Sequence, residues 1–285
     1  MCIPQSLTTA AAAGAPCPGP TSAAQRSAEA EQPALPPRVD WRTCHDVQQA
    51  APSLPADGEV HVWSCDLHHM PADGAAWLDA GERQRAQRLQ HDVHRRRFIA
   101  AHAWMRRILG LYLRQPPQSL RWATGPLGKP ALASAAPIAA LHFNLSHTED
   151  KALLAVSRTA AVGIDIEAIR PGMADAALRC AVLTASEHEA LLRLPGTEHD
   201  AAFYRCWTRK EAWLKALGLG LSIEPCTLHV GLAAACQRVR WPGMPHALTL
   251  TALPAPAGHA AALAVEGGLR RVVQFDTTSL AEARP

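Results

Sequence analysis

The chain has 285 residues, of which 48% are hydrophobic and 19% are charged, and its formal net charge is +3. This is enough apolar material for a sizeable core in one or two domains, which excludes a wholly disordered protein. The mild charge gives no argument for a nucleic-acid partner. No apolar run is long enough to span a bilayer, and no secretory signal opens the chain. We therefore expect a cytoplasmic protein with no membrane partner.

Residues 1–57 are rich in Ala, Pro, Ser and Gln. Such a segment buries too little apolar area to offset its ordering entropy, so we predict a disordered extension. The folded part is expected to begin with an alternating strand over residues 59–67. We place an N-terminal half at 58–158, a C-terminal half at 159–276 and a short tail at 277–285.

A long helix is predicted from about Gly81, because apolar residues recur at helical spacing as far as Ile108. Eight arginines lie between Gly81 and Arg107, against only Glu82 and Asp92. A solvated charged face is the usual interpretation of such a run. The other interpretation is phosphate binding, because the planar guanidinium donates two hydrogen bonds to a phosphate. The residues alone leave both open.

Two short segments follow that helix. The first, Gly125-Pro-Leu-Gly128-Lys129-Pro130, predicts a tight turn in which glycine lets the backbone approach a ligand and lysine adds a positive charge. Most turns of this kind only reverse the chain. The second, residues 141–147, predicts a strand with Asn144 and Ser146 on one face. Because Ser146 and His147 are adjacent on a strand, they point to opposite sides, and a serine hydrolase is not favoured.

Acidic and apolar residues alternate in Gly163-Ile-Asp165-Ile-Glu167. Period two predicts a strand with Asp165 and Glu167 on one face. Downstream, a capping box at Thr184 opens a predicted helix, and a second helix is expected over residues 203–217. The remaining predicted strands are 226–230, 247–252 and 260–265.

Glu211 and Lys215 stand one turn apart on the second of these helices. Together with Asp165 and Glu167 they could hold a hard cation with a phosphate beside it. The alternative is a solvated strand edge and a surface ion pair.

Four motifs resemble one family in their order and wording. They are G-I-D-I-E at 163–167, W-x-x-K-E-A-x-x-K-A-x-G-x-G-L at 207–221, G-P-L-G-K-P at 125–130 and F-N-L-S-H at 143–147. The family is that of the 4′-phosphopantetheinyl transferases, and more narrowly the surfactin-synthetase-activator type, in which one chain holds both halves of the site. The resemblance covers roughly Gly58 to Phe275.

This resemblance implies an α+β fold of two similar α+β halves in a pseudo-twofold arrangement, with the active-site cleft between them. It implies an enzyme that transfers the 4′-phosphopantetheine moiety of coenzyme A to a serine of an apo acyl or peptidyl carrier protein and releases adenosine 3′,5′-bisphosphate. It further implies Mg²⁺ as the metal and a monomer whose partners are coenzyme A and the carrier. Two other functions stay open: another magnesium-dependent phosphoryl enzyme, such as a nuclease or phosphatase, and a non-catalytic coenzyme A-binding module.

The resemblance also implies roles for individual residues. Asp165, Glu167 and Glu211 would hold Mg²⁺, with Glu211 also the candidate base and Lys215 meeting charge on the phosphates. The residues implied in coenzyme A binding are Arg85, Arg96, Arg97, Gly128, Lys129, Pro130, Ser146 and His147. The register of the arginines is open by one residue, and the sequence does not indicate which carrier is the acceptor.

Overall fold

The computed structural model describes residues 29–43, 53–125, 128–133, 141–242 and 244–277. The chain divides into two compact units, here called unit 1 (residues 1–37 and 161–268) and unit 2 (residues 38–160 and 269–285). The chain passes from unit 2 to unit 1 at residue 161, and its last strand returns to the sheet of unit 2.

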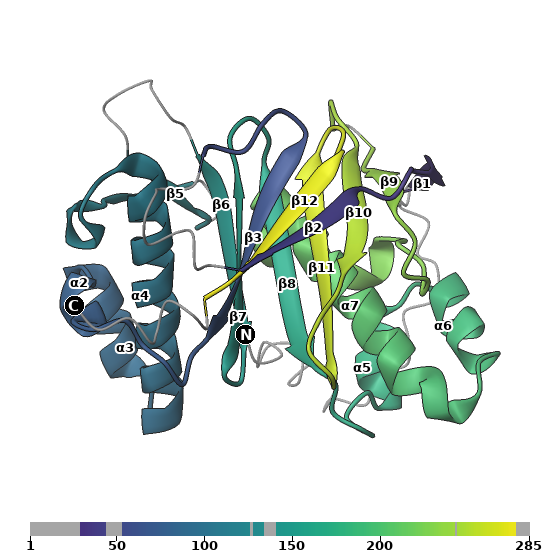
Figure 1. Ribbon diagram of the computed structural model, residues 1–285. Helices are drawn as coiled ribbons and strands as arrows, with labels where there is room; N and C mark the ends of the chain where they lie inside the picture. Colours follow the sequence, from purple (N-terminus) through teal and green to yellow (C-terminus); the bar gives the residue numbers. More distant parts are fainter. Residues whose placement is uncertain (1–28, 44–52, 126–127, 134–140, 243, 278–285) are drawn as a thin grey trace. The chain divides into compact units, whose positions relative to one another are not determined.

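Unit 1 contains a five-stranded sheet in the order β1-β9-β10-β11-β8, so that β8 is an edge strand (Figure 1). Every neighbouring pair in it is antiparallel, and Asp165 of β8 lies opposite Ala262 of β11. The strands are β1 (Glu29–Pro33), β8 (Val162–Ala168), β9 (Gln237–Arg240), β10 (Leu248–Leu253) and β11 (His259–Glu266).

The described residues of unit 1 also form the α-helices α5 (Ala176–Val182), α6 (Ala185–Leu192) and α7 (His199–Leu217). The predicted capping box is confirmed, since Thr184 accepts from the amide of Glu187 and Glu187 accepts from that of Thr184. The predicted strand at 226–230 is wrong. A 3₁₀ turn, η5 (Pro225–Thr227), forms there, because the fixed φ of proline suits the first position of a helical turn. Two further 3₁₀ turns are η3 (Gly196–Glu198) and η4 (Gly220–Ser222).

Unit 2 contains a sheet in the order β2-β12-β3-β7-β6, in which β12 runs parallel to both β2 and β3. Its strands are β2 (Arg38–Thr43), β3 (Glu59–Asp66), β6 (His142–Thr148), β7 (Lys151–Ser157) and β12 (Arg271–Asp276). A separate hairpin is formed by β4 (Trp122–Thr124) and β5 (Pro130–Leu132).

Strands β1 and β2 lie inside the segment predicted to be a disordered extension, so the structure differs from that prediction over residues 29–43. The reason is backbone pairing: β1 pairs with β9 and β2 pairs with β12. Asp40 of β2 also forms an ion pair of 2.7 Å with Arg271 of β12. The composition of a segment does not indicate whether it pairs with a strand far away in the chain. The rest of the predicted extension, 1–28 and 44–52, lies outside the described residues, apart from 53–57.

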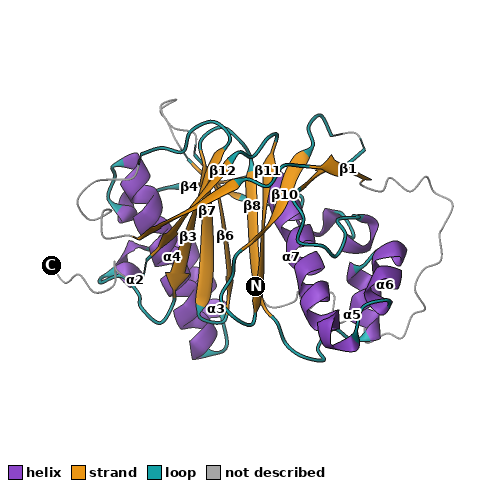
Figure 2. Cartoon of the chain, turned by 45° about the vertical axis from the view of Figure 1, so that its right-hand side comes forward, coloured by secondary structure: helices purple, strands orange, loops and turns teal. Residues whose placement is uncertain are grey.

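The predicted long helix is two helices, α3 (Ala80–Arg88) and α4 (Asp92–Leu113), which are separated because Leu89 and His91 have extended backbones. The described residues of unit 2 also form a helix, α2 (Gly74–Trp77), and a 3₁₀ turn, η2 (Pro117–Ser119). Helix α4 packs on the sheet of unit 2 (Figure 2). Its Trp104 and Ile108 are buried as predicted, in a core with residues of β3, β6, β7 and β12. Val93, also predicted to face the core, is 38% exposed.

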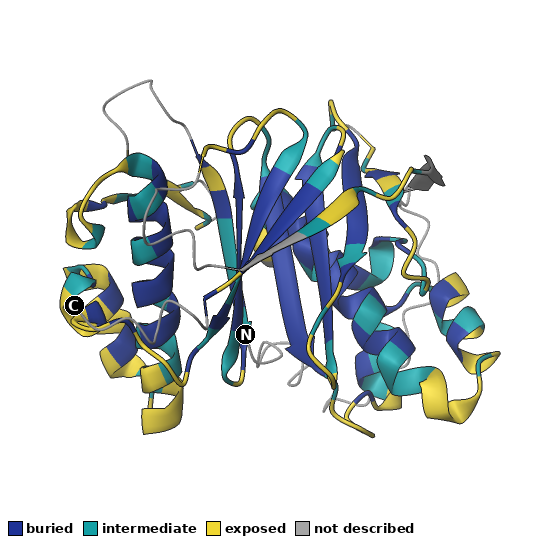
Figure 3. Ribbon diagram, viewed as in Figure 1, coloured by how far each residue is buried: buried dark blue, intermediate teal, exposed yellow. Residues whose placement is uncertain are grey.

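Arg106 is one of the eight arginines and belongs to the core, not to a solvated face. It is 0% exposed and donates to Glu82 at 2.7 Å and to Asp79 at 2.9 Å. Burial raises the pKa of Glu82, but hydrogen bonds from His102 and Arg106 outweigh this and lower it to about 2. These contacts bind α3 to α4. Figure 3 shows how burial is distributed: the strands are largely buried, and most residues of α3 are exposed.

None of the helices in the described part of the chain is sufficiently long and apolar to cross a membrane.

Candidate active site

Strand β8 carries the two acidic residues of the predicted site. Asp165 is 1% exposed and Glu167 is 7% exposed, while Ile164 and Ile166 on the other face are 0% exposed. Because all seven residues of β8 are buried, the alternative of a solvated strand edge is wrong. Buried carboxylates require compensation by charge or hydrogen bonds, and this makes their neighbours informative.

Helix α7 lies directly against β8 at Gly163. A methyl group on Gly163 would overlap the carbonyl oxygen of Ala212 and the amide nitrogen of Ala216, and would lie 2.9 Å from Ala216 Cα. Only glycine therefore allows the helix backbone to approach the strand this closely. As a result Glu211 and Lys215, which precede these two alanines in α7, lie within electrostatic reach of Asp165.

Lys215 is the cationic member of this cluster, and its Nζ contacts Asp165 Oδ1. The lysine side chain is 15% exposed and that of Asp165 is 1% exposed. Burial alone lowers the pKa of Lys215, but the charges of Asp165 and Glu211 outweigh it and raise the pKa above its ordinary value. Lys215 is therefore an ammonium ion at neutral pH, next to the buried Asp165 and the partly buried Glu211.

Glu211 has a different electrostatic environment. Burial raises its pKa, Lys215 opposes this and Asp165 adds to it, and the pKa reaches about 7. Its Oε1 atom is buried and has no hydrogen-bond partner among the described residues. A carboxyl group that titrates near neutral pH is suited to accept a proton.

The raised pKa of Glu211 predicts a pH-dependent effect on stability. Between pH 4.5 and 7 the folded protein holds a proton on Glu211 that the unfolded chain has lost, so stability falls as pH rises through this range. The penalty is at most about 3 kcal/mol. Without divalent metal, Glu211→Gln should therefore raise the melting temperature more at pH 8 than at pH 5. An equal change at the two pH values would contradict the raised pKa.

Among the described residues, the same cluster has the donor chemistry of a metal site but not the grouping of one. Within the described ranges, no three His, Cys, Asp or Glu side chains are grouped so that they could hold a metal ion. The donor chemistry nevertheless suits a hard cation, since Asp165, Glu167 and Glu211 offer only carboxylate oxygens and Glu211 Oε1 lacks a protein partner in the part described. The positive charge next to Asp165 is at present that of Lys215.

In unit 2, β6 presents Ser146 and His147 on opposite faces, as the alternation predicts. Ser146 is 3% exposed. His147 shares its face with Phe143 and Leu145, which pack in a core with residues of α4. His147 is therefore on the side of the sheet that α4 covers, and α4 carries Arg96 and Arg97.

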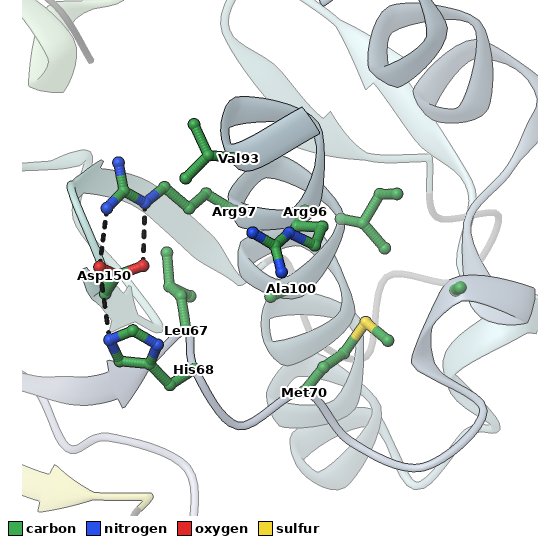
Figure 4. Close-up of a pocket in the computed structure, with 10 residues that line it drawn as sticks. Leu67, His68, Met70, Val93, Arg96, Arg97, Ala100 and Asp150 are labelled. Atoms are coloured by element: carbon green, nitrogen blue, oxygen red, sulfur yellow. Dashed lines mark hydrogen bonds and ion pairs between the residues drawn. The ribbon is translucent and has the colours of Figure 1, made fainter. Parts of the chain in front are cut away.

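A pocket of about 380 Å³ lies beside the first turns of α4 (Figure 4). Arg97 donates two hydrogen bonds to Asp150, at 2.9 and 2.7 Å, and His68 lies 3.4 Å from the same carboxylate. Hydrogen bonding to Arg97 lowers the pKa of Asp150. Arg96 is exposed on the same pocket. The lining residues are Leu67, His68, Met70, Ala75, Val93, Arg96, Arg97, Ile99, Ala100 and Asp150.

Asp150, the partner of Arg97, was not predicted from the sequence. The available signal was its place in the turn after the F-N-L-S-H strand, where Glu149 has a φ of 48°. Arg85, at the exposed end of α3, and residues 128–130, in the β4–β5 hairpin, do not line this pocket. The hairpin does contain the predicted turn, since Gly128 has a φ of 89° and the amide of Gly125 donates to Lys129 O at 2.9 Å.

The relatives of this chain show which class of protein it belongs to. A family model described as the 4′-phosphopantetheinyl transferase superfamily matches residues 161–246, which include β8 and α7. The chain is 39% identical over 167 residues to the 4′-phosphopantetheinyl transferase HetI of Nostoc sp. strain PCC 7120, covering 58% of this chain and 70% of that protein. It is therefore a transferase enzyme.

Two other relatives match this chain over fewer residues. The 4′-phosphopantetheinyl transferase AcpT of Salmonella typhimurium is 35% identical over 139 residues, covering 44% of this chain and 71% of that protein. The 4′-phosphopantetheinyl transferase psf-1 of Bacillus pumilus is 34% identical over 141 residues, covering 50% and 58%. This chain belongs to the 4′-phosphopantetheinyl transferase superfamily.

Proposed function

We propose that this protein transfers the 4′-phosphopantetheine arm of coenzyme A to a serine hydroxyl of an apo acyl or peptidyl carrier protein. The serine oxygen forms a bond to the β-phosphorus of coenzyme A, the pyrophosphate bond breaks, and adenosine 3′,5′-bisphosphate leaves. The observation that carries the proposal is the cluster of buried Asp165 and Glu167 with partly buried Glu211 and Lys215, inside the region that matches the superfamily. We assign the chain to the surfactin-synthetase-activator type, because its motifs for both halves lie in one chain.

Each member of the cluster has a proposed role. Glu211 takes the serine proton on its carboxylate, which its pKa near 7 allows at neutral pH. The Lys215 ammonium neutralises charge that develops on the phosphates, for which it must move from Asp165 toward the ligand. Asp165, Glu167 and Glu211 would hold Mg²⁺, and that ion would neutralise the pyrophosphate when bound.

The basic residues of unit 2 are proposed to bind the rest of coenzyme A. Arg96 and Arg97 are side chains of the pocket on α4, and His147 is on the face of β6 toward that helix. Arg97 donates two of its five N–H groups to Asp150, whereas Arg96 is exposed. Arg85, Gly128, Lys129, Pro130 and Ser146 remain proposed contacts to the same substrate.

The experiment that tests this function is mass spectrometry of an apo carrier protein after incubation with enzyme and coenzyme A. We expect one phosphopantetheinyl group on one serine, no addition after metal chelation, and none on a carrier whose serine is replaced by alanine. Hydrolysis of nucleic acid or of a phosphate ester without carrier modification would favour the alternative phosphoryl enzyme. Binding of coenzyme A without any turnover would indicate a binding module.

A prediction follows for the 3′-phosphate of coenzyme A, which we assign to His147 together with Arg96 or Arg97. A charge-assisted hydrogen bond contributes about 1.5–3 kcal/mol, or roughly ten- to a hundred-fold in affinity. His147→Ala should therefore weaken use of coenzyme A by this factor and hardly affect 3′-dephospho-coenzyme A, which lacks the group. Catalytic efficiency is measured with both substrates. Equal losses, accompanied by a lower melting temperature, would show that His147 is only structural.

A further inference from the structure

Lys210 is the lysine of the W-x-x-K-E-A motif and precedes the proposed base Glu211, but it has no place in the chemistry above. It is 0% exposed. Its Nζ donates to Val182 O at 2.6 Å, to Glu187 Oε2 at 2.6 Å and to Pro225 O at 2.9 Å. An ammonium group has three N–H donors, and these three bonds use all of them. Lys210 is therefore committed to protein partners and does not serve a phosphate.

Glu187, the partner of Lys210, is equally committed. Its Oε1 accepts from the amides of Val230 and Gly231, both at 2.8 Å, and its Oε2 accepts from the amide of Thr184 at 2.9 Å. Burial raises the pKa of Glu187, but the charge of Lys210 and these hydrogen bonds hold it below its ordinary value. The Glu187 carboxylate is therefore charged, and the side chains of both Glu187 and Lys210 are 0% exposed.

The pair joins α7 to four separate segments of unit 1. These are the end of α5 at Val182, the start of α6 at Thr184, the 3₁₀ turn η5 at Pro225, and residues 230–231. The neighbouring Arg209, also 0% exposed, adds bonds to Ala235 O at 2.7 Å and Val230 O at 3.1 Å. The same turn of α7 is thus fixed by two buried cations.

The position of this turn matters for the proposed site. Successive residues of an α-helix are rotated by a constant angle about its axis, so the direction of Lys210 determines the direction of Glu211. Lys215 follows little more than one turn later in the same rigid helix. A rotation or a slide of α7 would therefore move both Glu211 and Lys215 away from Asp165.

Stability is a weak explanation for a buried ion pair. Desolvation of the two ions offsets much of their attraction, and replacement of such pairs by apolar residues is often neutral or stabilising. We propose that Glu187 and Lys210 are positioning residues, which fix the rotation of α7 so that Glu211 and Lys215 face the acidic strand β8. This inference rests on the proposed function, because it concerns the placement of groups that act in that reaction.

The test compares a double variant with a matched control. Glu187→Gln combined with Lys210→Met removes the buried charges together, so that neither is left unpaired. The control is Glu189→Gln combined with Arg193→Met, which removes an ion pair on the same helix α6 whose side chains are 68% and 75% exposed. Melting temperature, kcat and KM for coenzyme A are measured for wild type and both variants with an apo carrier protein.

We expect the buried-pair variant to fold with a lower melting temperature, because the carbonyl oxygens of Val182 and Pro225 lose their donor. In the folded enzyme kcat should fall about 10- to 100-fold, while KM for coenzyme A changes less than about threefold. The control should match wild type in all three quantities. If the pair were only structural, the melting temperature would fall but the folded enzyme would keep wild-type kcat and KM. A folded buried-pair variant with wild-type kcat would overturn the inference.

A second variant, Lys210→Arg, covers failure of the double variant to fold. It keeps the charge but not the three-donor geometry, so we expect a folded enzyme with reduced kcat. If neither variant folds, the pair is needed for folding and the positioning role is wrong. Inactivity of the wild-type enzyme toward every apo carrier would instead contradict the proposed function, and this outcome is distinguished before any variant is compared.

Discussion

Asp165→Asn is expected to abolish phosphopantetheinyl transfer while the protein stays folded. The substitution keeps the side-chain volume on β8. It removes the negative charge that contacts Lys215, and with it a carboxylate proposed as a ligand of Mg²⁺. Changes to groups that only support a metal ligand typically cost about 10- to 100-fold, so loss of the ligand itself should exceed about 100-fold. The measurement is turnover of an apo carrier protein with metal removed and then restored.

Stability and activity can be separated at this position. Asp165→Asn removes the buried negative charge that opposes the Lys215 ammonium, so the melting temperature should fall. Adding Lys215→Met should restore stability but not turnover. A matched control is Glu266→Gln, at the end of the adjacent strand β11, which should leave both quantities unchanged. An Asp165→Asn enzyme with wild-type turnover would remove Asp165 from the site.

The local features of the site could be predicted from the sequence because they depend on short periodicities. Alternation in residues 163–167 gave the strand that carries Asp165, and helical spacing placed Glu211 and Lys215 on one helix. Asp165 and Glu167 lie on the same face of β8, as the alternation predicts. Their burial could not be predicted, since periodicity reports which face a residue occupies and not what covers that face.

Features that depend on distant partners were missed. The pairing of β2 with β12 and the bidentate Arg97–Asp150 contact join residues far apart in the chain, and no local pattern signals them. The break between α3 and α4 was missed because the apolar spacing continues through Leu89 and Val93. The burial of Arg106 and Lys210 was not predicted either. Charged residues are ordinarily exposed unless they are paired, and the sequence does not show their partners.

Gly163→Ala is expected to have the largest effect on the structure of unit 1. The added Cβ would overlap backbone atoms of Ala212 and Ala216, and a helix backbone, unlike the end of a side chain, has no alternative rotamer to adopt. Helix α7 would have to withdraw from β8, and Glu211 and Lys215 would withdraw with it. Overpacking of this kind costs about 1–3 kcal/mol or more.

The expected result is a melting temperature lower by several degrees, because 1 kcal/mol corresponds to roughly 2–4 °C in domains of this size. Turnover should fall further than the loss of folded protein explains, since the catalytic groups are displaced in the molecules that do fold. The matched control is Gly196→Ala in η3, where a Cβ meets no atom within 4 Å and the backbone is not left-handed. That variant should behave as wild type. If Gly163→Ala also did so, the close approach of α7 to β8 would not be what places Glu211 and Lys215 beside Asp165.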